Sequence, residues 1–317
     1  MYGFSGNSGQ LEKFLSKFGF DGLEMIQGMQ QWNVESIPAS LIVGLHMRFW
    51  PIWLDFWRND RAELLRQFGD EASYVGFYGG KSRDALIEYY RRELKTACDI
   101  GVKYVVLHVS HVQLEHCYDY RFTYSDGEVA DAFIEMINEL MDDTDAAFDL
   151  LLENQWQPGL TFLDNRITEK LMKEIVYPQK GFVLDIGHMM NTNTDLETEK
   201  EATGYILKVL GNMGELAGHI MGIHLNSSLS GGYVKKCIDS GVGSNKDESF
   251  FSRYLELLGH ISRVDRHIPF VDPSIRRVID FIRPEYLVYE FLTDSLDQLG
   301  KYIDIQNRVL ANPSNLY

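Results

Sequence analysis

Cysteine is scarce in this 317-residue sequence. The three cysteines, Cys98, Cys117 and Cys237, are odd in number and form no CxxC motif. They therefore predict neither a disulfide framework nor a metal site built from thiolates. A reducing compartment fits this composition best.

Long apolar runs are also missing. No run approaches the roughly 20 residues of a membrane span, and the first residues, MYGFSGNSGQLEKF, lack the basic and apolar regions of a signal peptide. We therefore expect a soluble, cytoplasmic protein without a membrane partner. Because no low-complexity stretch or long linker divides the chain, we expect residues 1–317 to form a single domain.

Basic residues are in deficit. The sequence has 30 Lys and Arg against 46 Asp and Glu, which gives a formal net charge of −16. Such a charge repels nucleic acid on average, although a local basic groove can exist within an acidic protein. DNA is therefore disfavoured as a partner but stays open.

The sequence does contain a recurring alternation of short apolar runs and amphipathic segments. Continuous apolar runs are typical of strands that are buried on both faces of a parallel sheet. Eight such runs lie at residues 1–5, 22–26, 41–47, 104–110, 150–154, 182–188, 220–226 and 286–291. Helical periodicity is clearest over 82–101, where Ser82 is the expected N-cap and Gly101 the expected end, and over 130–150. Eight strand-then-helix units predict an α/β fold, a single (β/α)8 barrel.

Two connections are longer than a minimal barrel needs. They follow the third and seventh strands, at residues 48–80 and 226 to about 276. The first contains RFWPIWLDFW, in which Trp50, Trp53 and Trp57 are three and four positions apart. This spacing favours a helical face packed on the barrel, and the alternative is a substrate lid that stacks on a base or sugar ring.

Potential metal ligands end the predicted strands from the third onward. The carboxyl ends of parallel barrel strands converge on one face, where active sites are built. Gathering carboxylates there without a cation is costly, so the pattern favours a bound divalent metal over a structural network. Imidazole and carboxylate ligands without thiolate fit Zn²⁺, Mn²⁺ or Mg²⁺. The strand-end residues are His46, His108, Glu153, Asp185, His188, His224 and Glu290.

Histidines elsewhere receive weaker assignments. His111 follows His108 by three residues and is a candidate for orienting a ligand through a hydrogen bond, as is Asn226 after His224. His116, His219 and His260 are expected to be helix or loop residues without a chemical role.

Five segments at the ends of the predicted strands resemble motifs of the endonuclease IV-like, or xylose isomerase-like, TIM barrels (AP endonuclease family 2). The segments are VVLHVSH, LLLENQWQPG, GFVLDIGHMMNTNTDL, IHLNSS and LVYEF. The resemblance implies two candidate chemistries. In an isomerase or epimerase, Glu153, Asp185, His224 and Glu290 hold one metal, and the two glutamates exchange a proton with a carbon next to a carbonyl.

In the endonuclease IV type, three zinc ions are implied. His46, His108 and Glu153 would hold the first. Glu153 would bridge to the second, which Asp185, His224 and Glu290 would also hold. His188 would hold the third together with the Asp-x-His pair that SRVDRHIPF supplies, Asp265 and His267. Because this resemblance finds a matching residue for all nine positions, we expect hydrolysis of a phosphoester in a small phosphorylated molecule or in abasic DNA, with Glu153 and Glu290 at the reacting centre. Sugar isomerisation or epimerisation is the alternative, and a barrel that binds a ligand without turnover is a third hypothesis.

Overall fold

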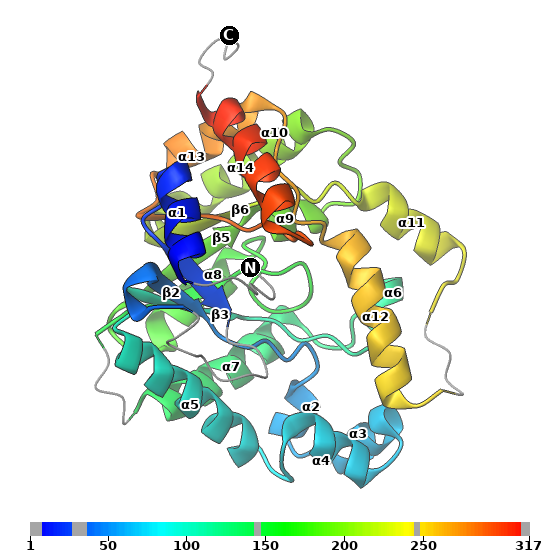
Figure 1. The fold of residues 1–317 in the computed structure, drawn as a ribbon. Coiled ribbons are helices and arrows are strands. Elements are labelled where there is room, and N and C mark those ends of the chain that lie inside the picture. Colours follow the sequence, from blue (N-terminus) through cyan, green and yellow to red (C-terminus); the bar gives the residue numbers. More distant parts are fainter. Residues whose placement is uncertain (1–7, 27–36, 143–146, 244–247, 312–317) are drawn as a thin grey trace.

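Seven parallel strands form the centre of the computed structural model, which describes residues 8–26, 37–142, 147–243 and 248–311. The strands are hydrogen-bonded in sequence order, each to the next, and helices surround them (Figure 1). The predicted strand at 1–5 lies outside the described residues. The other seven predicted strands are present, as β1 (Leu23–Ile26), β2 (Ile42–His46), β3 (Tyr104–His108), β4 (Asp149–Glu153), β5 (Lys180–Asp185), β6 (Ile220–Leu225) and β7 (Tyr286–Tyr289).

Alternate residues of each strand pack into two different cores. Val105 and Leu107 of β3 belong to the large core between the sheet and the helices. Tyr104 and Val106 belong to a small core inside the barrel. A side chain at Gly44 would come within 2.2 Å of the Tyr104 ring, so β2 has room only for glycine at this interior position. The pattern of side chains on both faces is that of a barrel strand.

Most of the surrounding helices follow strands, as the alternating pattern predicts. The α-helices are α1 (Ser8–Phe18), α2 (Leu54–Trp57), α3 (Arg61–Phe68), α4 (Glu71–Tyr78), α5 (Asp84–Ile100), α6 (His116–Asp119), α7 (Asp126–Met141), α8 (Asn165–Glu174), α9 (Ile186–Asn191), α10 (Glu199–Met213), α11 (Gly231–Asp239), α12 (Phe250–Val264), α13 (Arg276–Ile282) and α14 (Leu296–Ala311). Short 3-10 turns lie at Ala39–Leu41, Gly214–His219 and Pro273–Ile275.

Two helix predictions need correction at their ends. Helix α5 ends before Gly101 as expected, but Ser82 is not its N-cap: the Ser82 hydroxyl donates to Asp84 and leaves the first turn uncapped. Helix α7 begins four residues before the predicted start. Its N-terminus is a capping box, in which Ser125 and Glu128 each bond the other's backbone N–H. The predicted range ended in residues that form β4 instead.

Helices occupy both long connections. Helices α2, α3 and α4 lie between β2 and α5, and α11 and α12 follow β6. The two connections pack on each other, since the rings of Phe68 and Phe250 stack with centroids 3.9 Å apart and Arg253 donates to the carbonyl of Gln67. Figure 1 shows α3 and α4 beside the lower end of α12. Segments more than 180 residues apart thus build one wall at the edge of the barrel.

Over the ranges that the structure describes, no helix is both long and apolar enough to cross a bilayer.

Candidate metal centre

The carboxyl ends of the strands bring the predicted ligands to one rim of the barrel. His46, His108, Glu153 and Asp185 are the last residues of β2, β3, β4 and β5, while His224 is the penultimate residue of β6. The strand register aligns His108 with Glu153 and Asp185 with His224.

Strand phase explains why these side chains point inward. His108 is two and four residues after Val106 and Tyr104, which fill the interior of the barrel. Successive side chains of a strand alternate between its faces, so His108 shares their face.

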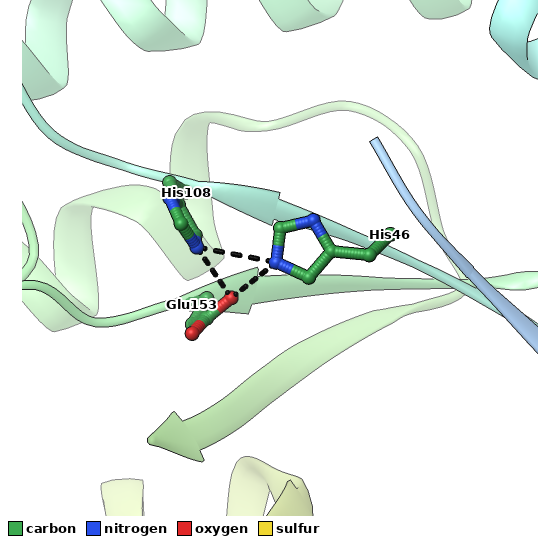
Figure 2. A group of neighbouring side chains, drawn as sticks. All are labelled: His46, His108 and Glu153. Atoms are coloured by element: carbon green, nitrogen blue, oxygen red, sulfur yellow. Dashed lines mark hydrogen bonds and ion pairs between the residues drawn. The ribbon is translucent and has the colours of Figure 1, made fainter. Parts of the chain in front are cut away.

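His46, His108 and Glu153 form the first ligand group. The Oε2 atom of Glu153 lies 2.9 Å from Nε2 of His46 and 2.9 Å from Nε2 of His108, and the two nitrogens are 3.2 Å apart. Figure 2 shows both rings turned toward the same carboxylate oxygen. Glu153 is fully buried. Two imidazoles and a carboxylate that converge in this way match the ligand set of a zinc site.

Glu153, Asp185, His224 and Glu290 form a second group, on the other side of Glu153. The Nδ1 atom of His224 lies 3.0 Å from Oε2 of Glu290 and 3.4 Å from Oε1 of Glu153. All three of these atoms are buried without a hydrogen-bond partner. Because a buried polar atom without a partner is costly, the cluster fits a cation among them.

His188, Asp265 and His267 form the third group, where α9 and the end of α12 meet. The Oδ2 atom of Asp265 lies 3.2 Å from Nε2 of His188 and 2.6 Å from Nε2 of His267. The backbone of His267 has φ of 46°, in the left-handed region that a residue with a Cβ rarely adopts. Strain of this kind is concentrated at functional sites, which agrees with a role for His267.

The pKa values show that the rim attracts positive charge. Burial lowers the pKa of His46, but the hydrogen bond and charge of Glu153 outweigh it and raise this pKa to about 9. In the same way, Asp265 and Glu290 outweigh burial and raise the pKa of His267 to about 10. Burial, reinforced by neighbouring carboxylates, raises the pKa of Asp185 to about 8.

The three groups fit divalent metal ions. Each offers at least three nitrogen or oxygen ligands within 4.8 Å of one another, and thiolates are not among them. Protons on histidine balance the carboxylates in part, and a cation can take their place. The donor set suits Zn²⁺, and the group with three carboxylates also suits Mn²⁺ or Mg²⁺.

The two residues expected to orient ligands have different surroundings. Asn226 donates from Nδ2 to Oδ2 of Asp185 at 2.7 Å, so it does contact a candidate ligand. A Cβ at Gly187 would come within 2.0 Å of the Asn226 side chain, so glycine is needed there. His111 instead accepts hydrogen bonds from the backbone N–H groups of Trp53 and Leu54 and contacts none of the three groups. Its ring therefore supports α2 and not a ligand.

The three tryptophans of the first connection are in the core. Trp50, Trp53 and Trp57 are each at most 5% exposed and pack in the large core. Only Trp57 lies within a helix, because α2 begins after Trp53. This placement corresponds to the packing interpretation and not to a substrate lid. A cavity of about 830 Å³ is lined instead by Phe49, Trp156 and the α12 residues Tyr254, Leu258 and Ile261, together with ligands of all three groups.

Four further residues contact the ligands without having been predicted. The Asn154 side chain accepts from the backbone N–H of Asp185 and donates to its backbone carbonyl. Gln155 lies against the rings of His108 and His188. Ser228 donates to Asp265 at 3.1 Å. Glu24 lies 3.1 Å from Nε2 of His224. Asn154 and Gln155 directly follow Glu153, which was a usable signal, whereas Glu24 lies inside a strand and not at its end.

Fold and rim together define a parallel α/β barrel with clustered imidazole and carboxylate ligands at the carboxyl ends of its strands. The family model of the xylose isomerase-like TIM barrel matches residues 13–281, and the chain belongs to this family. The match confirms the predicted TIM barrel and the resemblance seen in the sequence. No curated protein matches the chain at a significant level.

Two solved structures place the fold among known barrels. Endonuclease IV from Thermus thermophilus is 15% identical, with a TM-score of 0.52, over 98% of this chain and 96% of that one. A 3-keto-D-glucoside 4-epimerase from E. coli is 14% identical, with a TM-score of 0.50, over 98% and 97% of the two chains. At these identities the similarity shows the fold alone, and it includes one enzyme of each candidate chemistry.

Proposed function

We propose that this protein is a metal-dependent phosphoester hydrolase with up to three divalent ions, most suitably Zn²⁺. The observation that carries the proposal is the third ligand group, His188, Asp265 and His267, which lies beside the other two. A single-metal isomerase needs only Glu153, Asp185, His224 and Glu290, and it has no use for an additional Asp-x-His pair.

Glu153 is the centre of the proposed site. Its Oε2 atom faces His46 and His108, and its Oε1 atom faces His188 and His224. The carboxylate is therefore oriented from both sides. Bound divalent ions would supply water activation and neutralisation of the phosphate oxygens. Glu153 and Glu290 would then hold the attacking water and its proton in place beside the phosphorus.

The cavity favours a small substrate over DNA. Among the described residues that line it, Arg48 and Lys103 are the only arginine and lysine, and Lys103 precedes β3 at the far end of the barrel. The Arg48 guanidinium lies over the rings of Trp50 and Tyr89. A DNA backbone requires several such cations, and the net charge is −16. A small phosphorylated molecule or sugar phosphate is therefore the preferred substrate, and abasic DNA is the second candidate.

Isomerisation or epimerisation of a sugar is the competing function. It is favoured by the approach of Glu153 and Glu290 to the same atom, Nδ1 of His224, which places the two carboxylates of an acid–base pair close together. Such a pair is the arrangement that proton transfer at a carbon requires.

Removal of the third group separates the two functions. His267→Ala replaces no residue of the four-ligand group, and the hydrogen bond that it removes from that group goes to the backbone carbonyl of Glu290 and not to its carboxylate. It should therefore leave a sugar isomerase active but lower phosphoesterase kcat/KM by about 10²- to 10³-fold, the usual effect of losing one electrostatic stabiliser. Activity is measured on bis(p-nitrophenyl) phosphate, sugar phosphates, abasic oligonucleotides and ketoses in D₂O. His116→Ala is the matched control, because His116 pairs with Asp119 and contacts none of the three groups. Deuterium exchange into ketoses that persists in His267→Ala, without phosphoester cleavage by the wild type, would refute the hydrolase.

A further inference from the structure

Three histidines of the rim are held in the same orientation. The Nδ1 atoms of His46, His188 and His267 lie 2.8, 2.9 and 3.1 Å from the backbone carbonyls of Met47, Asn154 and Glu290. A carbonyl can only accept a hydrogen bond, so each Nδ1 carries the hydrogen. The Nε2 atom of each ring is then left to face the carboxylates and to bind a metal.

His224 has the opposite orientation. Its Nε2 atom lies 3.1 Å from Oε2 of Glu24, and its Nδ1 atom faces Glu290 and Glu153. The side chain of His224 is fully buried and that of Glu24 is 4% exposed. A carboxylate, not a backbone carbonyl, therefore holds the outer nitrogen of this ring.

We infer that Glu24 is a positioning residue for the ligand group of Glu153, Asp185, His224 and Glu290. By accepting the hydrogen of Nε2, it makes Nδ1 of His224 the metal-binding atom. Its negative charge also makes this imidazole a stronger donor than a carbonyl-held ring, as carboxylate partners of ligand histidines do. The inference rests on the metal centre proposed above but not on the reaction.

A structural role would not require the charge of Glu24, because the neighbouring Tyr104 hydroxyl, which hydrogen-bonds to it, needs only a neutral acceptor. Strand β1 pairs Glu24 with Gly44, which places it on the interior face and below the rim. Three carboxylates already lie in the neighbouring ligand group, and a fourth buried negative charge adds repulsion in the metal-free protein. A backbone carbonyl would orient His224 equally well, so the carboxylate adds donor strength and not only geometry.

Glu24→Gln isolates the charge, because glutamine keeps the shape and can still accept the hydrogen from Nε2. We expect affinity for one zinc equivalent to fall by about 10- to 100-fold, with the other two unchanged, as measured by competition with a chelator and by elemental analysis. Glu93→Gln is the matched control. Glu93 is also a buried glutamate, but it accepts from the backbone N–H of Arg48 and not from a histidine. The zinc affinities of the Glu93→Gln variant should equal those of the wild type.

The possible outcomes separate a failure of this inference from a failure of the proposed metal centre or of the proposed reaction. Affinities of Glu24→Gln within a factor of two of the wild type overturn the role of Glu24. A wild type that binds no metal overturns both the role and the centre. Weakened binding in Glu24→Gln without phosphoesterase activity in the wild type supports the role and refutes the hydrolase.

A measurement on the wild type covers the case in which Glu24→Gln does not fold. In the zinc-loaded protein labelled with ¹⁵N-histidine, long-range ¹H–¹⁵N correlations report which ring nitrogen carries the hydrogen. We expect His224, assigned through His224→Gln, to carry it on Nε2, and His46, His188 and His267 to carry it on Nδ1. A hydrogen on Nδ1 of His224 overturns the inference.

Discussion

Asp265→Asn is the sharpest test of the third ligand group. The Oδ2 atom of Asp265 is the only carboxylate oxygen within 3.2 Å of the Nε2 atoms of both His188 and His267 in the part of the chain that the structure describes. Asparagine has the same shape but removes the negative charge and turns a metal-binding oxygen into a weaker or donating group. We expect the variant to fold and to lose one metal ion.

The expected losses of stability and of metal affinity follow from the buried surroundings of Asp265. Removing one partner of a buried ion pair costs about 3–5 kcal/mol, because the other charge stays buried without compensation. The metal-free variant should lose about this much stability at pH 7, measured by urea denaturation. Loss of a residue that only hydrogen-bonds a ligand weakens metal binding by about 10- to 100-fold. Loss of a ligand itself, as proposed for Asp265, should weaken metal binding by more than that.

Elemental analysis after gel filtration is the assay. The wild type should hold three zinc equivalents per chain and Asp265→Asn two. Ser228→Ala is the control. It removes the 3.1 Å hydrogen bond to Oδ1 of Asp265 and the bond that the hydroxyl accepts from the backbone N–H of Arg266, but it removes no candidate ligand atom, so it should keep three equivalents. Three equivalents in Asp265→Asn would show that Asp265 is not a ligand. Loss of all three from a folded variant would show that the groups are not independent.

Two further predictions concern stability. The pKa values of His46 and His267, raised to about 9 and 10 from 6.5, contribute stability that is complete below pH 6.5 and lost as the pH rises through 9 and 10. The free energy of unfolding of the metal-free protein, measured by urea denaturation, should therefore fall by a few kcal/mol between pH 6.5 and 10. A free energy that stays constant over this range would contradict the raised pKa values of the two histidines. Trp53→Ala should cost about 3–5 kcal/mol, because Trp53 is buried and donates to the carbonyl of Ser110. Its metal content should not change, and loss of metal from the folded variant would show that this part of the core supports the metal centre.

The position of the candidate ligands at the strand ends could be predicted because two regularities combine. A parallel strand that is buried on both faces appears as an apolar run, and a polar residue at the end of the run comes out at the carboxyl rim. His46, His108, Glu153 and Asp185 satisfy both conditions, since each is the last residue of its strand. No knowledge of distant contacts was needed.

His111 and Glu24 could not be predicted because their partners are set by the tertiary path of the chain. The backbone N–H of His111 bonds to the carbonyl of Pro158, and its ring accepts from the backbone N–H groups of Trp53 and Leu54 at the start of α2. Glu24 meets His224 across 200 residues, where the two strands face each other inside the barrel. Residue spacing carries no information on either contact.

The wide separation of the ligands along the chain has a consequence for the order of folding. The first group joins strands from His46 to Glu153, the group of four extends from Glu153 to Glu290, and the third extends from His188 to His267. No complete ligand group exists until strands far apart in the sequence have paired in register. At the proposed centre, metal ions would therefore bind only after the barrel has formed and would not act as an early nucleus. Interactions that form after the transition state slow unfolding and leave the folding rate unchanged, so metal bound at the proposed centre would prolong the lifetime of the folded state.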